Sequence, residues 1–289
     1  MAKFTRVLVG HDGGEHAEDA LALGKAIADR LAAELVLGSV VPNPIGGSMV
    51  PALPAEAFTN LTEHAKRMLE TAADAVGAGH EIEQSSSASH GLQTIADRIE
   101  ADLIVVGSSP RAEEGRTRAG RKARQLMSGG VAAVAIAPDG FRHRVALDRI
   151  GIGIDGSPES RLAVEAAIDL AGEDGSLELV AVASGLADEW GRWGVTYPLA
   201  EMAEATREAA ALLLDEMAVV VPGRLRLERK LMEGTAPIQL AKASEDLDLL
   251  CLGSRGYGPV RRVLLGSVSS DVVNHAASAV LVVPRTEND

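Results

Sequence analysis

Short apolar runs alternate along the chain with longer segments in which apolar residues recur every three or four positions. Runs of about four to eight apolar residues between turn residues are typical of buried parallel strands, and the longer segments are typical of amphipathic helices. In the first half the predicted strands are Arg6–Gly13, Leu35–Val41, Glu81–Ser85, Asp102–Gly107 and Ala132–Ala137. The predicted helices between them are Glu15–Ala32, Ala55–Val76, Leu92–Glu100 and about Gly120–Ser128.

The same series of landmarks occurs twice. The landmarks are Asp12, Gly107, Gly120 and Pro138 in the first half and Asp155, Gly253, Gly266 and Pro284 in the second, at nearly the same spacing. Alternating strands and helices imply right-handed βαβ units and a parallel sheet with helices on both faces. We therefore predict an α/β protein of two doubly wound, five-stranded parallel-sheet domains, residues 1–140 and 147–289, with a linker at Asp139–Arg144.

The second half contains the stretch with the most specific chemistry. A buried strand over Leu249–Leu252 is followed by Gly253, two residues, Gly256, nine residues and then Gly266-Ser267. An apolar-periodic segment, Val268–Ala276, predicts a helix that begins at this point. Glycines let the backbone approach a ligand closely, and free N–H groups at a helix start suit an anion. The stretch therefore predicts a polyphosphate site.

This spacing resembles the ATP-binding signature of the universal stress protein family, in its nucleotide-binding subclass. The resemblance covers the whole chain and implies the adenine nucleotide alpha hydrolase-like fold, with ATP bound alone or with Mg²⁺. By position it implies that the nucleotide contacts Asp155, Val182, Gly253, Arg255, Gly256, Gly266, Ser267, Val268 and Ser269. Two alternatives stay open: Asp155 stabilises the turn before the next helix, and Arg255 is a solvated loop residue.

The first half departs from this pattern. Asp12, Val40, Gly107 and Gly120 stand at the corresponding positions, but Pro110 replaces the second glycine and Arg121 replaces the hydroxyl residue. Proline lacks an N–H donor, which alters a phosphate cradle. The surrounding segment is basic and contains Arg111, Arg116, Arg118, Arg121, Lys122 and Arg124. We expect this half to have lost ordinary ATP binding; the alternative is that side-chain charge replaces backbone donors for some other anion.

Composition narrows the class of partners. The chain of 289 residues has 28 basic and 41 acidic residues, a formal net charge of −13, which opposes general affinity for nucleic acid or anionic membranes. Its one cysteine, Cys251, lies in an apolar run, which excludes an intramolecular disulfide and favours a reducing compartment. No apolar run approaches the ~20 residues of a membrane span. We expect a soluble, cytoplasmic protein.

Two other motifs are rejected as ligand sites. Gly151–Gly156 is a literal GxGxxG, but its first two glycines fall inside a predicted strand, which argues against dinucleotide binding. His11 precedes Asp12, yet Ile154 stands at the corresponding place in the second half, so we interpret His11 as a strand-end residue without catalytic function.

The leading functional hypothesis is a nucleotide-dependent stress-response switch. No water-activating base, arginine finger or pair of metal-binding carboxylates is evident near the glycine loop, so we assign no catalytic or metal-binding residue. One alternative is a slow adenine-nucleotide hydrolase or phosphotransferase, and another is a scaffold that binds a protein partner and carries a vestigial nucleotide site. The resemblance also implies that the halves pair through Ala132–Ala137 and Ala279–Val283 as an internal pseudo-dimer, and that two chains associate.

Overall fold

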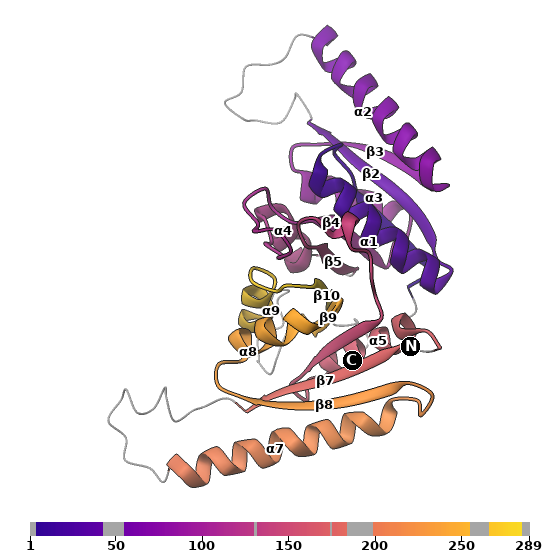
Figure 1. The fold of residues 1–289 in the computed structure, drawn as a ribbon. Helices are drawn as coiled ribbons and strands as arrows, with labels where there is room; N and C mark the ends of the chain where they lie inside the picture. Colours follow the sequence, from indigo (N-terminus) through magenta and orange to yellow (C-terminus); the bar gives the residue numbers. More distant parts are fainter. Residues whose placement is uncertain are drawn as a thin grey trace. The chain divides into compact units, whose positions relative to one another are not determined.

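The protein forms two compact units, Phe4–Val145 and Ala146–Asp289 (Figure 1). The computed structural model describes residues 4–42, 55–129, 132–173, 175–183, 199–254 and 266–284. The unit boundary leaves the predicted linker, 139–144, within the first unit.

The first unit is a five-stranded sheet in the order β3-β2-β1-β4-β5, with every described pairing parallel. Its strands are β1 (Arg6–Gly10), β2 (Glu34–Pro42), β3 (Gly79–Ser85), β4 (Leu103–Gly107) and β5 (Ala133–Ala137). Its helices are α1 (Glu15–Leu31), α2 (Ala55–Val76), α3 (Ala88–Arg98), α4 (Arg121–Gly129) and the 3-10 turn η1 (Phe141–His143).

Helices cover both faces of this sheet. Consecutive strand residues point to opposite faces, and in β1 the neighbours Leu8 and Val9 contact different helices. A Cβ on Gly24 of α1 would lie 2.3 Å from Cγ2 of Val9, so α1 packs against the face to which Val9 points. On the other face, a Cβ on Gly38 would lie 2.8 Å from Leu8 and 3.3 Å from Ile95 of α3. The unit is therefore a three-layer α/β structure.

The second unit repeats this topology in the order β8-β7-β6-β9-β10, again with parallel pairings. Its strands are β6 (Arg149–Ile154), β7 (Ser176–Ala183), β8 (Arg226–Glu233), β9 (Leu249–Gly253) and β10 (Ala279–Val283). Its helices are α5 (Pro158–Ala171), α7 (Leu199–Val220), α8 (Ala236–Ala243), α9 (Ser267–Val272) and the 3-10 turn η2 (Ser244–Asp246).

Two features of the second unit argue against dinucleotide binding at Gly151–Gly156 and against a reactive thiol at Cys251. Gly151 and Gly153 lie within β6, where they leave room for the side chains of Leu247 and Leu252. Cys251 is fully buried in β9, and its burial raises the pKa of the thiol well above the ordinary value. A thiol of this kind stays neutral and is a poor nucleophile.

The predicted fold class, α/β with doubly wound parallel sheets, is confirmed. Most predicted element boundaries agree with the structure to within a few residues. The helix predicted over Val268–Ala276 is shorter, because α9 ends at Val272.

The predicted linker is packed rather than extended. Phe141 in η1 is only 4% exposed, and the carboxylate of Asp19, which is fully buried, binds the segment. Asp19 accepts hydrogen bonds from the backbone N–H groups of Gly140 and Arg142, both at 3.0 Å, and from the Arg142 guanidinium at 3.0 Å. The segment 140–142 is therefore fixed to α1 of its own unit.

Among the described residues, no helix combines the length and the apolar character that crossing a membrane would require.

Candidate functional site

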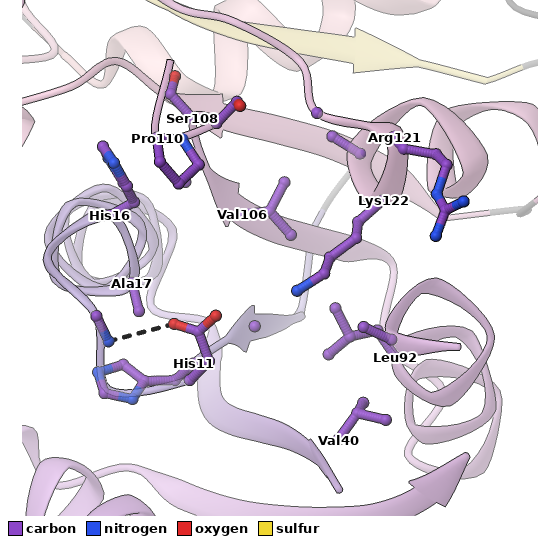
Figure 2. A pocket seen from close by; sticks show the side chains of 18 of the residues that line it. His11, His16, Ala17, Val40, Leu92, Val106, Ser108, Pro110, Arg121 and Lys122 are labelled. Carbon is purple, nitrogen blue, oxygen red and sulfur yellow. Dashed lines mark hydrogen bonds between the residues drawn. The ribbon is translucent and has the colours of Figure 1, made fainter. Parts of the chain in front are cut away.

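The first unit contains a cavity of about 510 Å³ at the carboxyl ends of its strands (Figure 2). The chain leaves β1 toward β2 on one side, whereas β4 lies on the other side of β1, so the strand order reverses at this point. Ligands of doubly wound sheets bind in such crevices. The volume lies within the range of small-molecule sites, roughly 300–1,000 Å³.

The cavity brings together all four residues predicted for this half, Asp12, Val40, Gly107 and Gly120. Val40, Leu92 and Val106 form an apolar wall, and Lys122 extends from the start of α4 into the cavity (Figure 2). The sequence reasoning missed Leu92, and only its place at the start of the predicted α3 segment could have indicated it. The arrangement suits a ligand with an apolar or planar body and an anionic end.

Asp12 follows the tip of β1 and is exposed. The backbone N–H of Gly14 donates to its Oδ1 at 3.2 Å, which fixes the carboxylate in a turn. No described residue donates to Oδ2, which leaves that oxygen available to a ligand hydroxyl. His11, only 3% exposed, also lines the cavity, and its Nε2 lies 3.1 Å from Oε1 of Glu18.

The loop between β4 and α4 is closed by its own hydrogen bonds. Ser109 N–H donates to the carbonyl of Arg118 at 2.8 Å, and Ala112 N–H donates to the carbonyl of Ser109 at 2.8 Å. The hydroxyl of Ser108 accepts from Arg118 N–H at 3.2 Å and donates to the carbonyl of Ala137 at 2.8 Å. These amides satisfy loop acceptors and are not available to a phosphate.

The tip of the same loop is tied to the end of β5. Gly115 N–H donates to the carbonyl of Asp139 at 3.0 Å, and Asp139 N–H donates back to the carbonyl of Arg116 at 3.2 Å. Gly115 has a φ of +76°, a conformation that L side chains rarely adopt. The loop is therefore a folded element with fixed ends.

In the second unit, Asp155 occupies the tip of β6 in the same way. Its Oδ1 accepts from the N–H of Ser157 at 3.0 Å and from the Ser157 hydroxyl at 2.5 Å. Ser157 Oγ in turn accepts from Ser160 N–H at 3.1 Å and caps α5. The turn-stabilising role considered for Asp155 is thus present, and the carboxylate is exposed at the sheet edge.

The two ends of the predicted phosphate loop meet at the end of β9. Gly266 N–H donates to the carbonyl of Ser254 at 2.7 Å, and Ser254 N–H donates to the carbonyl of Val283 at 2.8 Å. Ser269, predicted to offer its hydroxyl to phosphates, is 5% exposed and donates to the carbonyl of Gly253 at 2.7 Å. Ser267 is exposed at the first position of α9.

Gly253 and Gly107 are required by packing within the protein. A Cβ on Gly253 would lie 2.7 Å from Cβ of Glu159 and 2.9 Å from the backbone nitrogen of Ser160. A Cβ on Gly107 would lie 1.9 Å from the carbonyl oxygen of His16. The close approach that the sequence suggested for a ligand is, at both glycines, an approach of the strand end to the helix that follows the neighbouring strand, α1 or α5.

The remaining predicted residues divide into two groups. Val182 is partly buried in β7, in register with Met232 of β8, and Val268 is partly buried in α9. Arg255 and Gly256 lie outside the described residues, so their predicted roles stay predictions.

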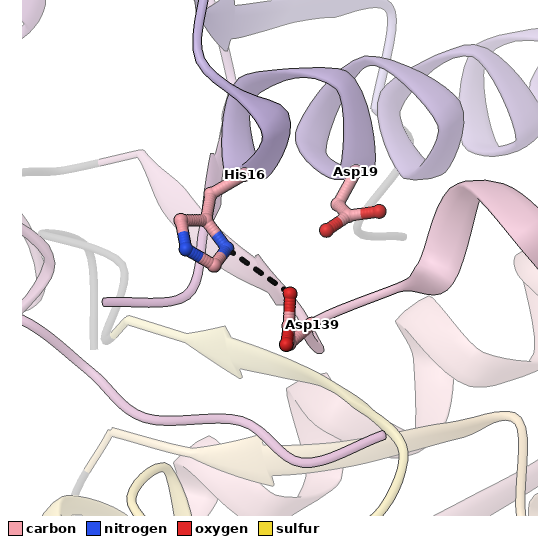
Figure 3. Close-up of side chains that lie close together, drawn as sticks. All are labelled: His16, Asp19 and Asp139. Atoms are coloured by element: carbon pink, nitrogen blue, oxygen red, sulfur yellow. Dashed lines mark ion pairs between the residues drawn. The ribbon is translucent and has the colours of Figure 1, made fainter. Parts of the chain in front are cut away.

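A compact group of His16, Asp19 and Asp139 lies beside the cavity (Figure 3). Nδ1 of His16 is 3.3 Å from Oδ1 of Asp139. These side chains could in principle hold a cation, but Asp19 already accepts from Arg142 and Gly140. The guanidinium of Arg142 supplies the positive charge there, so we interpret the group as an anchor for the segment after β5.

The two units, each with turn residues and glycines at the carboxyl edge of its sheet, define a tandem doubly wound α/β protein. The sequence profile of the "Universal stress protein family" matches residues 3–137 and 146–284. The chain therefore belongs to the universal stress protein family, and the resemblance seen in its sequence is confirmed.

Individual relatives agree with this assignment. A universal stress protein of Mycolicibacterium smegmatis is 30% identical over 263 residues, which cover 85% of this chain and 84% of the relative. One from Mycobacterium tuberculosis is 27% identical over 240 residues, covering 76% and 77%. The crystal structure of a universal stress protein from Archaeoglobus fulgidus is similar over 100% of both chains, with a TM-score of 0.69 and 18% identity, which supports the fold.

Proposed function

We propose that the chain is an ATP-binding stress-response protein whose second unit holds the nucleotide and acts as a nucleotide-dependent switch. The observation that carries the proposal is the 2.7 Å hydrogen bond from Gly266 N–H to the carbonyl of Ser254. It brings the two ends of the glycine signature together at the end of β9. Membership of the universal stress protein family supports a stress-response role without specifying the ligand.

Asp155 directly follows β6, the strand next to β9 in the sheet. Gly253 packs against Glu159 and Ser160, and Ser160 is bonded to Ser157, which holds Asp155. The carboxylate of Asp155 and the end of β9 are thus connected through packed residues at the start of α5. We propose that a nucleotide places its ribose hydroxyls at Asp155 and its phosphates at Gly253, Ser254 and Gly266, the described ends of the glycine signature.

A switch is favoured over a fast enzyme. Oδ1 of Asp155 is held by both the N–H and the hydroxyl of Ser157, which suits a fixed acceptor for ligand hydroxyls. Ser269 donates to the carbonyl of Gly253 and so holds α9 against the end of β9. We therefore propose no catalytic residue.

Ser267→Glu in the full chain tests the site. Ser267 is exposed at the start of α9, so the variant should fold, and its carboxylate would repel the phosphates. Two like charges about 4 Å apart at a protein surface repel strongly enough to weaken binding at least tenfold. Isothermal titration calorimetry with ATP measures the change.

Ala205→Glu is the matched control, because it adds the same charge at an exposed position of α7. It should leave ATP affinity unchanged. If the Ser267→Glu variant and the unmodified chain bind ATP with equal affinity, the assignment of the ATP site to the second unit is wrong. A chain that binds no ATP would favour the scaffold, and turnover of ATP lost in the Ser267→Glu variant would favour the enzyme.

A further inference from the structure

The outer face of α7 carries large apolar side chains that are exposed. Figure 1 shows α7 lying along β7 and β8, and the helix packs on these strands through buried residues such as Leu214 and Met217. On the opposite side Leu212 is 68% exposed, Val219 84% and Val220 54%. Exposed apolar residues that gather on one face, unlike single ones, are typical of interaction surfaces.

These residues form a row along the helix. Ala205, Leu212 and Val219 follow one another at intervals of seven residues, Ala209 and Val220 lie beside them, and all five are exposed. Positions seven apart lie two turns apart on the same side of a helix, which is the spacing at which one helix packs along another. The row is about 21 Å long at a rise of about 1.5 Å per residue.

The corresponding helix of the first unit has no such face. Helix α2 has the same length, 22 residues, and covers β2 and β3 as α7 covers β7 and β8. Its exposed positions are mostly polar and include Asn60, Glu63, His64 and Arg67. Among the described side chains of α2, Leu61 is the only large apolar one that is exposed, at 40%. The fold therefore does not require an apolar outer face on this helix.

The apolar row of α7 is bordered by acidic residues. Glu201, Glu204 and Glu208 are exposed in the N-terminal half of the helix. Within the described part of the chain, none of these three glutamates makes an ion pair. The one basic residue of α7, Arg207, lies 3.6 Å from Glu233 and is paired with it. A molecule that covers this face therefore needs positive charge beside its apolar residues.

We propose that the outer face of α7 docks a basic amphipathic helix of another protein. Apolar side chains of that helix contact Leu212 and Val219, and its lysine or arginine side chains face the three glutamates. A second copy of this chain fits less well, because antiparallel pairing centred on Leu212 would set Glu208 against Glu216 of the copy, and each chain has a formal net charge of −13. The proposal does not depend on ATP binding.

A synthetic helical peptide tests this face in the full chain. The probe has about three heptads with leucine at positions a and d, lysine at e and g and alanine elsewhere, and it carries a fluorophore. Fluorescence anisotropy at physiological ionic strength should show saturable binding of the peptide to the unmodified chain. A peptide with glutamate in place of every lysine should bind at least tenfold more weakly, because it would face the acidic border.

A double variant tests the apolar contacts. Leu212→Gln combined with Val219→Gln should weaken binding of the lysine peptide about 10- to 100-fold, because both apolar contacts are lost. Leu61→Gln is the matched control on α2 and should leave the affinity unchanged. Because all three side chains are exposed, the variants should match the unmodified chain in thermal unfolding midpoint.

A second pair of variants tests the acidic border. Glu204→Gln combined with Glu208→Gln should weaken binding of the lysine peptide and reduce the dependence of its affinity on salt concentration. Glu63→Gln removes the same charge from an exposed position of α2 and should change neither.

Three results would each overturn the proposal: no saturable binding of the lysine peptide, equal affinities of the Leu212→Gln/Val219→Gln and Leu61→Gln variants, or a glutamate peptide that binds as tightly as the lysine peptide. Sedimentation velocity examines the other occupant. If the unmodified chain is a dimer that the Leu212→Gln/Val219→Gln variant converts to a monomer, the face belongs to a second copy and the proposal is wrong.

Discussion

At the scale of single residues, the first glycine of each signature has a structural function of its own. Gly107 lies against the carbonyl of His16, and Gly253 lies against Glu159 and Ser160. In both units the strand end therefore touches the first turn of the helix that follows the neighbouring strand. The glycines that precede α4 and α9, Gly120 and Gly266, are not constrained in this way. A Cβ on Gly120 would meet nothing closer than 3.7 Å, and Gly266 has an ordinary φ of −61°.

Gly253→Ala should therefore destabilise the protein whether or not a nucleotide is present. Insertion of a methyl group into a packed contact typically costs about 1–3 kcal/mol. Gly120→Ala, whose Cβ would make only an ordinary van der Waals contact with Ser109 at 3.7 Å, should change the free energy of unfolding by less than about 0.5 kcal/mol. Urea denaturation without ligand compares the two, and equal losses of stability would show that the contact at Gly253 relaxes freely.

At the scale of elements, the segment after β5 is held by α1. Asp19 is fully buried in α1 and accepts from Gly140 and from Arg142, which are more than 120 residues away along the chain. Asp139, just before them, exchanges backbone hydrogen bonds with Gly115 and Arg116 of the loop between β4 and α4. A single helix thus positions η1 and, through Asp139, the loop beside the cavity.

Asp19→Asn tests this arrangement. The amide keeps one acceptor oxygen, but its NH₂ group would face N–H donors, leaving buried groups unpaired at a cost of about 1–3 kcal/mol. Asp29→Asn is the control on the same helix, since its partner Lys25 is 40% exposed and such pairs contribute about 0–1 kcal/mol. Chemical denaturation should rank Asp19→Asn well below Asp29→Asn in stability, and the reverse order would contradict the anchor.

The sequence predicted the elements well because periodicity is a local property. The predicted bounds of α2 and β10 agree with the structure, as does the end of β5 before Pro138. The role of Asp19 could not be predicted, since its partners are distant in sequence and the only local signal was an acidic residue among apolar neighbours on α1. The hydrogen bonds within the loop between β4 and α4 could not be predicted either, because the sequence shows which residues are charged but not which backbone amides already donate to protein acceptors.

At the scale of the whole molecule, the two units have separate cores. The first is centred on fully buried residues of β1 and β4, such as Leu8 and Ile104, and the second on residues of β6 and β9, such as Ile150 and Leu250. Each unit has the size of an ordinary domain, about 100–150 residues. Each also contains a complete parallel sheet with its own helices.

The fragments 1–145 and 146–289 should therefore each fold alone. We expect α/β far-ultraviolet circular dichroism spectra and a cooperative urea transition for both. The cut at 145 keeps η1 with Asp19, whereas a cut at 138 removes Gly140 and Arg142 from that carboxylate and should give a less stable first fragment. A fragment 1–138 as stable as 1–145 would contradict this boundary.

The packing of Gly107 and Gly253 also limits how repeats of this kind can diverge. A half that has lost nucleotide binding would still need this glycine to keep its fold, because any side chain there would push the strand end away from the helix. Its presence in other chains is therefore weak proof of a working site. Two other positions of the signature are the better guide to the ligand, because they can change with it. They are occupied by Pro110 and Arg121 in the first half and by Gly256 and Ser267 in the second.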